Sequence, residues 1–186
     1  MMALADYIIK KHVPMGEDPE IPTFRGKIGM SLGWISIITN LLLFGIKLFF
    51  GIISNSIALI ADAFHTLSDM ASSAVVVFGF KMASKPADKA HPFGHGRAET
   101  IAALTIAMLI GFAGFEFLKT SSSRLMSIEM MQVNQIVIIV VIFTIILKEA
   151  MARLSYSLGQ IIQSDTLKAD AFHHRTDMFS SLLVLV

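Results

Sequence analysis

Five apolar segments of membrane-spanning length constrain the fold of this chain more than any other feature. They cover residues 28–53, 56–83, 98–118, 133–158 and 167–186. A helix rises about 1.5 Å per residue, so about 20 apolar residues cross a hydrocarbon core roughly 30 Å thick. Charged residues make up 16% of the chain, against roughly a quarter in soluble domains. The sequence therefore predicts an all-α integral membrane protein whose transmembrane domain occupies residues 28–186.

Residues 1–27 differ in composition from the rest of the chain. They hold three of the five prolines and an acidic patch at Glu17, Asp18 and Glu20. We expect a flexible cytoplasmic segment with one short helix near residues 3–11, and not a cleaved signal peptide, which would place its apolar region close to the N-terminus.

Basic residues predict the orientation of the chain in the membrane. Lysines and arginines gather in residues 1–27, in the connection between the second and third segments and in that between the fourth and fifth. By the positive-inside rule, these parts and the N-terminus face the cytoplasm of a multi-pass protein of the cell membrane. The formal net charge is only +1, and no basic patch predicts a nucleic-acid partner. The last apolar segment is still apolar at Val186, so we expect the chain to stop within or just after its fifth helix.

A ten-residue phrase occurs twice in the chain. Residues 61–70 read ADAFHTLSDM and residues 169–178 read ADAFHHRTDM. Both copies carry Asp, His and Asp at offsets of three and four, which return to one face of a helix. The two stripes are Asp62, His65 and Asp69, and Asp170, His173 and Asp177.

Ionisable side chains inside a membrane are costly and point to a functional site. His65, Asp69, His173 and Asp177 offer two imidazole nitrogens and two carboxylates, a donor set suited to tetrahedral Zn²⁺. Asp62 and Asp170 lie one turn back on the same stripes, where they would orient a ligating imidazole or line the ion pathway. The neighbouring His174 points about 100° away on the helix and is expected to face water or another helix.

The connection between the second and third segments contains a second cluster. Asp88, His91 and His95 provide one carboxylate and two imidazoles near the membrane surface, and are read either as a metal site or as a solvated polar loop. The chain has no cysteine, so any metal must be held by histidine and carboxylate ligands.

The remaining charged residues of the apolar segments lie closer to the segment ends. Lys148 and Glu149 are expected to extend to the membrane interface, and Lys47 to do the same. Asn40 lies deeper and could line a cavity.

The phrase at Ser56–Asp69, the HPFGHGRAE loop at His91–Glu99 and the second HxxxD at His173–Asp177 resemble the cation diffusion facilitator family. The resemblance covers residues 28–186 in order. It implies a bundle of six transmembrane helices, of which about five are present here, together with a homodimer and export of divalent metal in exchange for protons. The sixth helix and the C-terminal cytoplasmic domain that the family carries would be absent.

The resemblance also implies roles for single residues. The transport site would use His65, Asp69, His173 and Asp177, and the histidine at position 65 resembles that of zinc-preferring members. Asp88 and His95, with His91, match a secondary loop site. Arg97 matches the basic position that pairs with the cytoplasmic domain.

These features predict a zinc efflux transporter, a metal/proton antiporter in the lipid bilayer, and not an enzyme. Four protein ligands saturate a tetrahedral site, whereas a catalytic zinc keeps one position open. The alternatives are an intramembrane metalloenzyme or a metal sensor using the same ligands, or a transporter of the same family for Fe²⁺, Mn²⁺, Co²⁺ or Cd²⁺.

Overall fold

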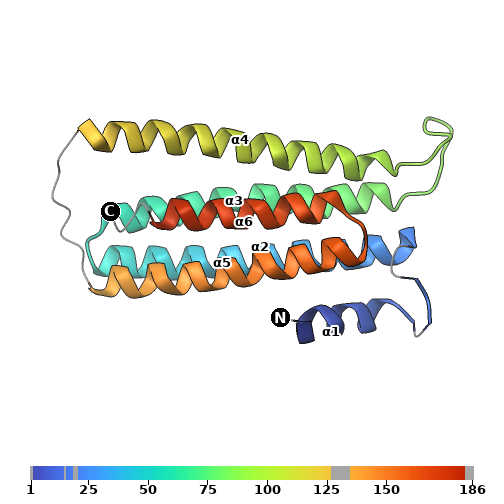
Figure 1. Cartoon of the computed structure of the whole chain (residues 1–186), viewed down its shortest axis with the longest axis horizontal. Helices are drawn as coiled ribbons and strands as arrows, with labels where there is room; N and C mark the ends of the chain where they lie inside the picture. Colours follow the sequence, from blue (N-terminus) through green and yellow to red (C-terminus); the bar gives the residue numbers. More distant parts are fainter. Residues whose placement is uncertain (1, 15, 19–20, 127–134, 183–186) are drawn as a thin grey trace.

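The computed structural model describes residues 2–14, 16–18, 21–126 and 135–182, and its regular elements there are all helices. The short first helix is α1 (Met2–His12). The long helices are α2 (Pro22–Ile53), α3 (Ile57–Ala83), α4 (Arg97–Met126), α5 (Gln135–Ile161) and α6 (Asp165–Leu182). Figure 1 shows the long helices running side by side, with α1 alongside one end of the bundle. The predicted all-α transmembrane bundle is confirmed.

The helices follow the predicted segments closely. α2, α3, α4 and α5 are each long and apolar enough to cross a membrane. α4 continues to Met126, beyond the predicted end at residue 118, because the polar residues that follow are compatible with a helix once it has left the hydrocarbon. Residues 133–134 and 183–186 of the predicted segments lie outside the described residues.

Local signals set the helix boundaries. Pro22 is the first residue of α2, where its fixed φ suits a helix and its missing N–H costs nothing. The hydroxyl of Ser56 accepts a hydrogen bond from the backbone N–H of Leu59 (3.3 Å) and caps α3. Asn55 precedes it with φ of 51°, a left-handed conformation that Asn tolerates and that lets the chain reverse.

Glycines allow α2 and α3 to pack closely against each other. A Cβ added at Gly29 would lie 2.3 Å from the ring of Phe80, and one added at Gly33 would lie 2.5 Å from a methyl carbon of Val77. These distances are shorter than any real carbon–carbon contact, so only glycine fits. The side-by-side packing of the two helices therefore depends on sequence positions that carry no side chain.

The first helix docks on the bundle. Ala5, Ile8 and Val13 are buried in the same hydrophobic cluster as residues of α2 and α5. The expectation of a flexible segment is therefore wrong for the residues of α1: its apolar face packs on the long helices, as an amphipathic helix does. The predicted short helix is confirmed.

His12 ends α1 and holds it to α2. One of its ring nitrogens lies 2.8 Å from the hydroxyl oxygen of Ser31. Burial, followed by the positive charges of Lys11 and Lys27, holds the pKa of His12 below its usual value of 6.5. A neutral imidazole is therefore the form that fits this contact.

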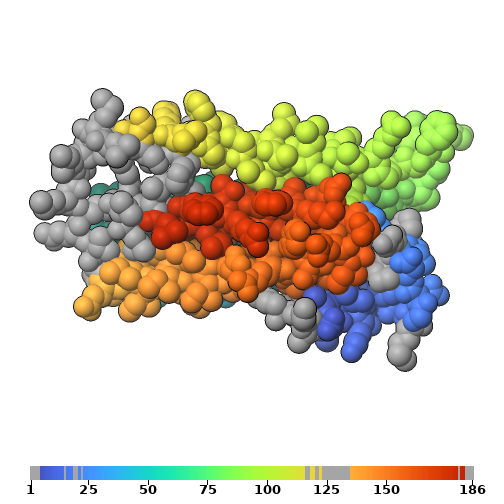
Figure 2. All heavy atoms as spheres, in the orientation of Figure 1, coloured from blue at the N-terminus to red at the C-terminus, as the bar shows by residue number. Residues whose placement is uncertain are grey.

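A carboxylate joins three helices at the end of the bundle where α4 begins. Glu99 accepts two hydrogen bonds from the guanidinium of Arg25 on α2, at 2.8 and 2.9 Å. It also accepts one from the hydroxyl of Ser164 (2.6 Å), in the turn before α6. Figure 2 shows α6 lying between α4 and α5 on the visible face, so this cluster ties together elements far apart in the sequence.

Candidate metal centre

Four helices direct buried polar side chains into the interior of the bundle. α2 contributes Ser36, Asn40 and Lys47; α3 contributes Asp62, Thr66, Asp69, Ser72 and Ser73; α5 contributes Thr144, Lys148 and Ser155; α6 contributes Asp170, His173, His174, Asp177 and Ser181. Burying such groups is unfavourable unless they are paired. Their gathering in one bundle marks its interior as the functional part.

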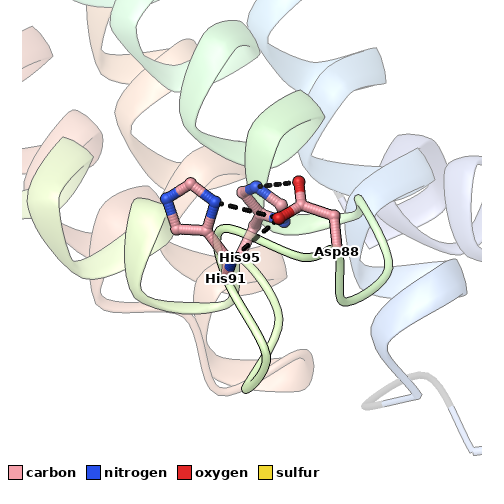
Figure 3. A group of neighbouring side chains, drawn as sticks. All are labelled: Asp88, His91 and His95. Atoms are coloured by element: carbon pink, nitrogen blue, oxygen red, sulfur yellow. Dashed lines mark hydrogen bonds and ion pairs between the residues drawn. The ribbon is translucent and has the colours of Figure 1, made fainter.

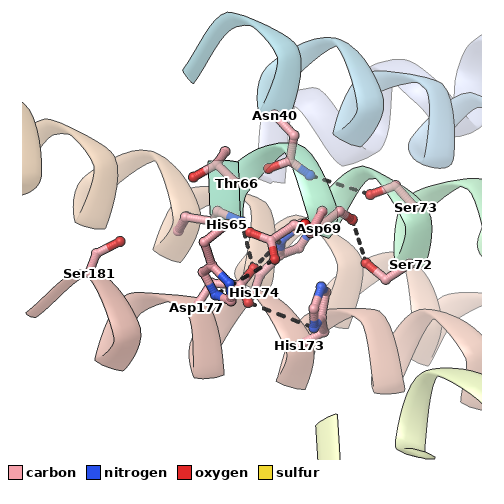
Figure 4. A network of polar contacts seen from close by, with 12 residues as sticks. Asn40, His65, Thr66, Asp69, Ser72, Ser73, His173, His174, Asp177 and Ser181 are labelled. Carbon is pink, nitrogen blue, oxygen red and sulfur yellow. Dashed lines mark hydrogen bonds and ion pairs between the residues drawn. The ribbon is translucent and has the colours of Figure 1, made fainter. Parts of the chain in front are cut away.

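Three of the four predicted metal ligands come together between α3 and α6. His65, Asp69 and Asp177 each offer a ligand atom, and these atoms lie within 4.8 Å of one another. Figure 4 shows the side chains of α3 and α6 facing each other across this space. Ligand atoms around one tetrahedral zinc lie about 3.5 Å apart, given bond lengths of about 2.0–2.2 Å. Small side-chain rotations would bring these three atoms into that geometry.

His173, the fourth predicted ligand, lies beside this group and not within it. Its Nδ1 is 3.7 Å from Oδ1 of Asp177, and only 5% of the residue is exposed. Both ring nitrogens are buried without a hydrogen-bond partner in the described part of the chain, as is Nε2 of His65. Buried imidazole nitrogens without partners are costly. They fit a site that accepts a ligand at those nitrogens.

A lysine completes the group, and sequence reasoning did not find it. The Nζ atom of Lys148 on α5 lies 2.9 Å from Oδ2 of Asp69 and 2.5 Å from Oδ2 of Asp177. The side chain is 1% exposed, so the expectation that it extends to the interface is wrong. Two buried carboxylates satisfy its charge better than distant water would.

Lys47 on α2 is also buried, contrary to expectation, because one buried carboxylate pairs with its ammonium. Its Nζ lies 2.8 Å from Oδ2 of Asp62 and donates a hydrogen bond to the hydroxyl of Thr66 at 2.7 Å. Asp62 therefore pairs with a lysine and not with a predicted ligating imidazole. Its assignment to the ion pathway stays a prediction.

Asp170 and His174 form a further buried network. The hydroxyl of Ser155 donates to Oδ2 of Asp170 (2.8 Å), and Nε2 of His174 lies 3.4 Å from the same oxygen. That nitrogen is also 3.1 Å from the hydroxyl of Ser36. His174 thus faces neighbouring helices, one of the two expected environments, and it is the imidazole that Asp170 contacts.

Two other polar residues of the spans follow the sequence expectation more closely. Glu149 is partly exposed and pairs with Arg153 at 2.6 Å. Asn40 is buried and donates to the hydroxyl of Ser73 at 3.5 Å, while its side-chain oxygen has no partner in the described residues.

The loop cluster forms as the sequence pattern suggested. Asp88, His91 and His95 offer ligand atoms within 4.8 Å of one another, and Figure 3 shows both imidazoles turned toward the carboxylate. The backbone N–H of His91 donates to Asp88 (2.7 Å), and this bond is the main reason that the pKa of Asp88 lies below its usual range. Arg97, the predicted coupling residue, is exposed at the first position of α4.

A spacing pattern in the sequence could have revealed the buried lysines. The buried polar residues of α2 stand at positions 36, 40 and 47, and those of α5 at 144, 148 and 155, with the same offsets of four and seven. Such offsets place each set on one helix face. Lys47 and Lys148 therefore belong to polar stripes that face the interior, like those of α3 and α6.

Comparison with known proteins finds one family over most of the chain. A family model described as the cation efflux transmembrane domain matches residues 33–186. An uncharacterized transporter of Methanocaldococcus jannaschii, MJ0449, is 41% identical over 152 residues, which are 82% of this chain and 54% of that protein.

Two further relatives carry more specific names. The manganese efflux system protein MneP of Bacillus subtilis is 29% identical over 163 residues, 87% of this chain and 54% of its own length. The magnetosome protein MamM of Paramagnetospirillum magneticum is 40% identical over 86 residues, 46% of this chain and 27% of its own length. The chain thus spans about half the length, or less, of these relatives.

Proposed function

Because the chain belongs to the cation diffusion facilitator family of cation efflux proteins, we propose that it forms the membrane part of a transporter that exports a divalent metal ion. The observation that carries this proposal is the meeting of Asp69, Asp177 and His65 in the bundle interior. The two carboxylates and His173 are buried, the side chain of His65 is 41% exposed, and both imidazoles have ring nitrogens without a hydrogen-bond partner in the described residues. Such a group is suited to bind a cation in transit.

The transported ion is bound by His65, Asp69, His173 and Asp177. Two nitrogens and two carboxylate oxygens in a compact site favour zinc. Manganese is the second candidate, because MneP is named a manganese efflux protein. Carboxylates and water suit that harder ion better than imidazoles do.

Exchange with protons provides the driving force. Imidazole must be neutral to ligate a metal, so proton binding and metal binding oppose each other at His65 and His173. A bundle that rocks between two arrangements, each open to one side of the membrane, then exchanges metal for protons. Asp62 and Asp170, one turn from the ligands on their helices, line the path.

The N-terminus and the loop cluster lie on the cytoplasmic side of the cell membrane, as the basic residues indicate. Residues 1–27 form a cytoplasmic segment and residues 28–186 the transmembrane domain. The transporter works as a homodimer. Asp88, His91 and His95 bind metal at the cytoplasmic entrance, and Arg97 contacts a cytoplasmic domain. The donor set supports transport over catalysis, because four protein ligands leave no open position for a reacting water.

Zinc binding to the purified chain in nanodiscs, measured by calorimetry, tests the site assignment. The variants Asp69→Asn and Asp177→Asn should each weaken binding by 10-fold or more, on the order of the loss of one charged ligand. The matched variant Asp88→Asn, in the loop, should leave the membrane site intact.

Loss of all zinc binding in Asp88→Asn, with normal binding in both membrane-site variants, would place the metal in the loop and refute the assignment. Zinc-dependent proton flux in proteoliposomes then separates a transporter from an enzyme or a sensor. No flux from a protein that binds zinc would contradict the exchange mechanism.

A further inference from the structure

The ammonium of Lys148 lies between the two carboxylates of the candidate metal centre. It contacts Oδ2 of Asp69 on α3 and Oδ2 of Asp177 on α6, at 2.9 and 2.5 Å. We propose that Lys148 acts as a tethered monovalent cation that competes for these carboxylates and restricts the site to divalent ions. This inference rests on the proposed function, because it takes Asp69 and Asp177 as ligands of the transported metal.

The ammonium and a metal ion compete for the same two carboxylates. A zinc ion would lie about 2.0–2.2 Å from its ligand oxygens, a position close to that of Nζ. An ion held instead by the two Oδ1 atoms, which face His65 and His173 at 3.8 and 3.7 Å, would still share both carboxylates with the ammonium. In the first position the ammonium occupies the place of the ion, and in the second its charge repels the ion. In both cases the lysine weakens cation binding.

Lys47 shows what an ordinary buried lysine looks like in the same bundle. It pairs with the single carboxylate of Asp62, and a hydroxyl completes its contacts. One ammonium and one carboxylate form a neutral pair. Lys148 faces two carboxylates instead, and the surplus negative charge lies beside imidazole nitrogens that have no hydrogen-bond partner in the described residues. The arrangement at Lys148 is therefore suited to receive further positive charge.

The charges at the centre itself favour a further cation. Asp69, Asp177 and Lys148 are in direct contact and together carry a formal charge of −1. An uncompensated buried charge is costly, so the centre is suited to an ion that brings more positive charge than the ammonium alone.

Competition with a tethered ammonium disfavours alkali-metal ions in particular. Na⁺ or K⁺ offers the carboxylates the same single charge as Lys148, whose attachment to α5 gives it a high effective concentration. A divalent transition-metal ion offers twice the charge and also binds imidazole, which alkali-metal ions do not. The lysine thus disfavours monovalent ions because of their lower charge, and ligand geometry determines the preference among divalent ions.

The variant Lys148→Met tests this role, in a background that carries Asp88→Asn to silence the loop. Zinc affinity is measured by calorimetry at fixed pH and ionic strength, in choline, Na⁺ or K⁺ salts. We expect Lys148→Met to bind zinc at least about tenfold more tightly in choline, the lower end for a close buried charge pair. Na⁺ and K⁺ should weaken zinc binding to this variant and should not change zinc binding to the protein that keeps Lys148.

Two controls accompany the variant. Lys148→Arg keeps the positive charge and should retain the weaker affinity and the insensitivity to Na⁺. Lys47→Met removes the other buried ammonium and should change zinc affinity much less than Lys148→Met does. Circular dichroism confirms the helical content of each variant.

If Lys148→Met does not fold, the protein with its lysine intact still decides the question. Zinc-bound crystals should show anomalous density between Asp69 and Asp177, with Nζ of Lys148 no longer in contact with both. Three outcomes would overturn this inference and leave the proposed function standing. They are unchanged or weaker zinc affinity in Lys148→Met, an equal gain in affinity from Lys47→Met, and zinc bound while Nζ still contacts both carboxylates. No zinc binding by the unsubstituted membrane site would overturn the proposed function together with it.

Discussion

The buried pair of Lys47 and Asp62 allows a quantitative test of the bundle's electrostatics. Its two charged atoms lie 2.8 Å apart, with side chains 1% and 3% exposed. Removing one partner leaves an uncompensated buried charge, which costs about 3–5 kcal/mol. Lys47→Met leaves the carboxylate of Asp62 without its ammonium partner, and Asp62→Asn leaves the ammonium of Lys47 without its carboxylate partner. Replacing both at once removes both charges of the pair, so we expect the double variant to lose roughly 1 kcal/mol or less.

Thermal unfolding in detergent, followed by circular dichroism, measures these differences. For a chain of this size, 1 kcal/mol corresponds to a shift in Tm of about 2–4 °C. Each single variant should therefore melt about 6–20 °C lower, by the same conversion, and the double variant should recover most of that loss. The double-mutant cycle isolates the coupling between the two groups. Additive losses, with the double variant less stable than either single one, would refute the reasoning.

Two further predictions concern the parts of the bundle near Glu99 and α1. Glu99→Gln removes the charge from the contact with Arg25, and we expect a loss of about 2 kcal/mol, seen as a lower Tm. Glu149→Gln, whose partner Arg153 is largely exposed, should cost at most about 0.5 kcal/mol, and equal losses would contradict this expectation. Because the pKa of His12 is lowered in the folded chain, the undocked segment binds more protons, so α1 docking is fully stable above about pH 6.5 and weakens as the pH falls below it. Spin-label distances between α1 and α5 should lengthen on acidification, and His12→Gln should abolish that response.

Much of the fold can be predicted from the sequence, because the thickness of the membrane sets both the length of an apolar segment and the length of the helix that it forms. The predicted segment 56–83 differs by one residue at its start from α3, and 133–158 overlaps almost all of α5. Repetition of the phrase also placed Asp69 and Asp177 on facing helices. The prediction is wrong for Lys47 and Lys148, because the distance of a residue from a segment end does not show which face of the helix it occupies.

The remaining features, the pairing of side chains and the docking of α1, depend on tertiary contacts, which a sequence pattern does not reveal. The partner of Asp170 is His174 and not His173, because the hydroxyl of Ser36 on α2 contacts the His174 imidazole, while Ser155 on α5 donates to Asp170. The docking of α1 depends on contacts with α2 and α5, two helices that are distant in sequence. The pairing of Arg25 with Glu99 joins residues 74 positions apart.

The glycine contacts between α2 and α3 limit how this bundle can deform. At Gly29 and Gly33 the backbone of α2 lies against the side chains of Phe80 and Val77, so rolling or sliding one helix along the other would drive atoms together. We therefore expect the two helices to resist sliding along their seam and to move together. Asp69 lies on α3 and Asp177 on α6, so a change in the spacing of these two carboxylates would come from displacement of α6 against the α2–α3 pair and not from movement between α2 and α3.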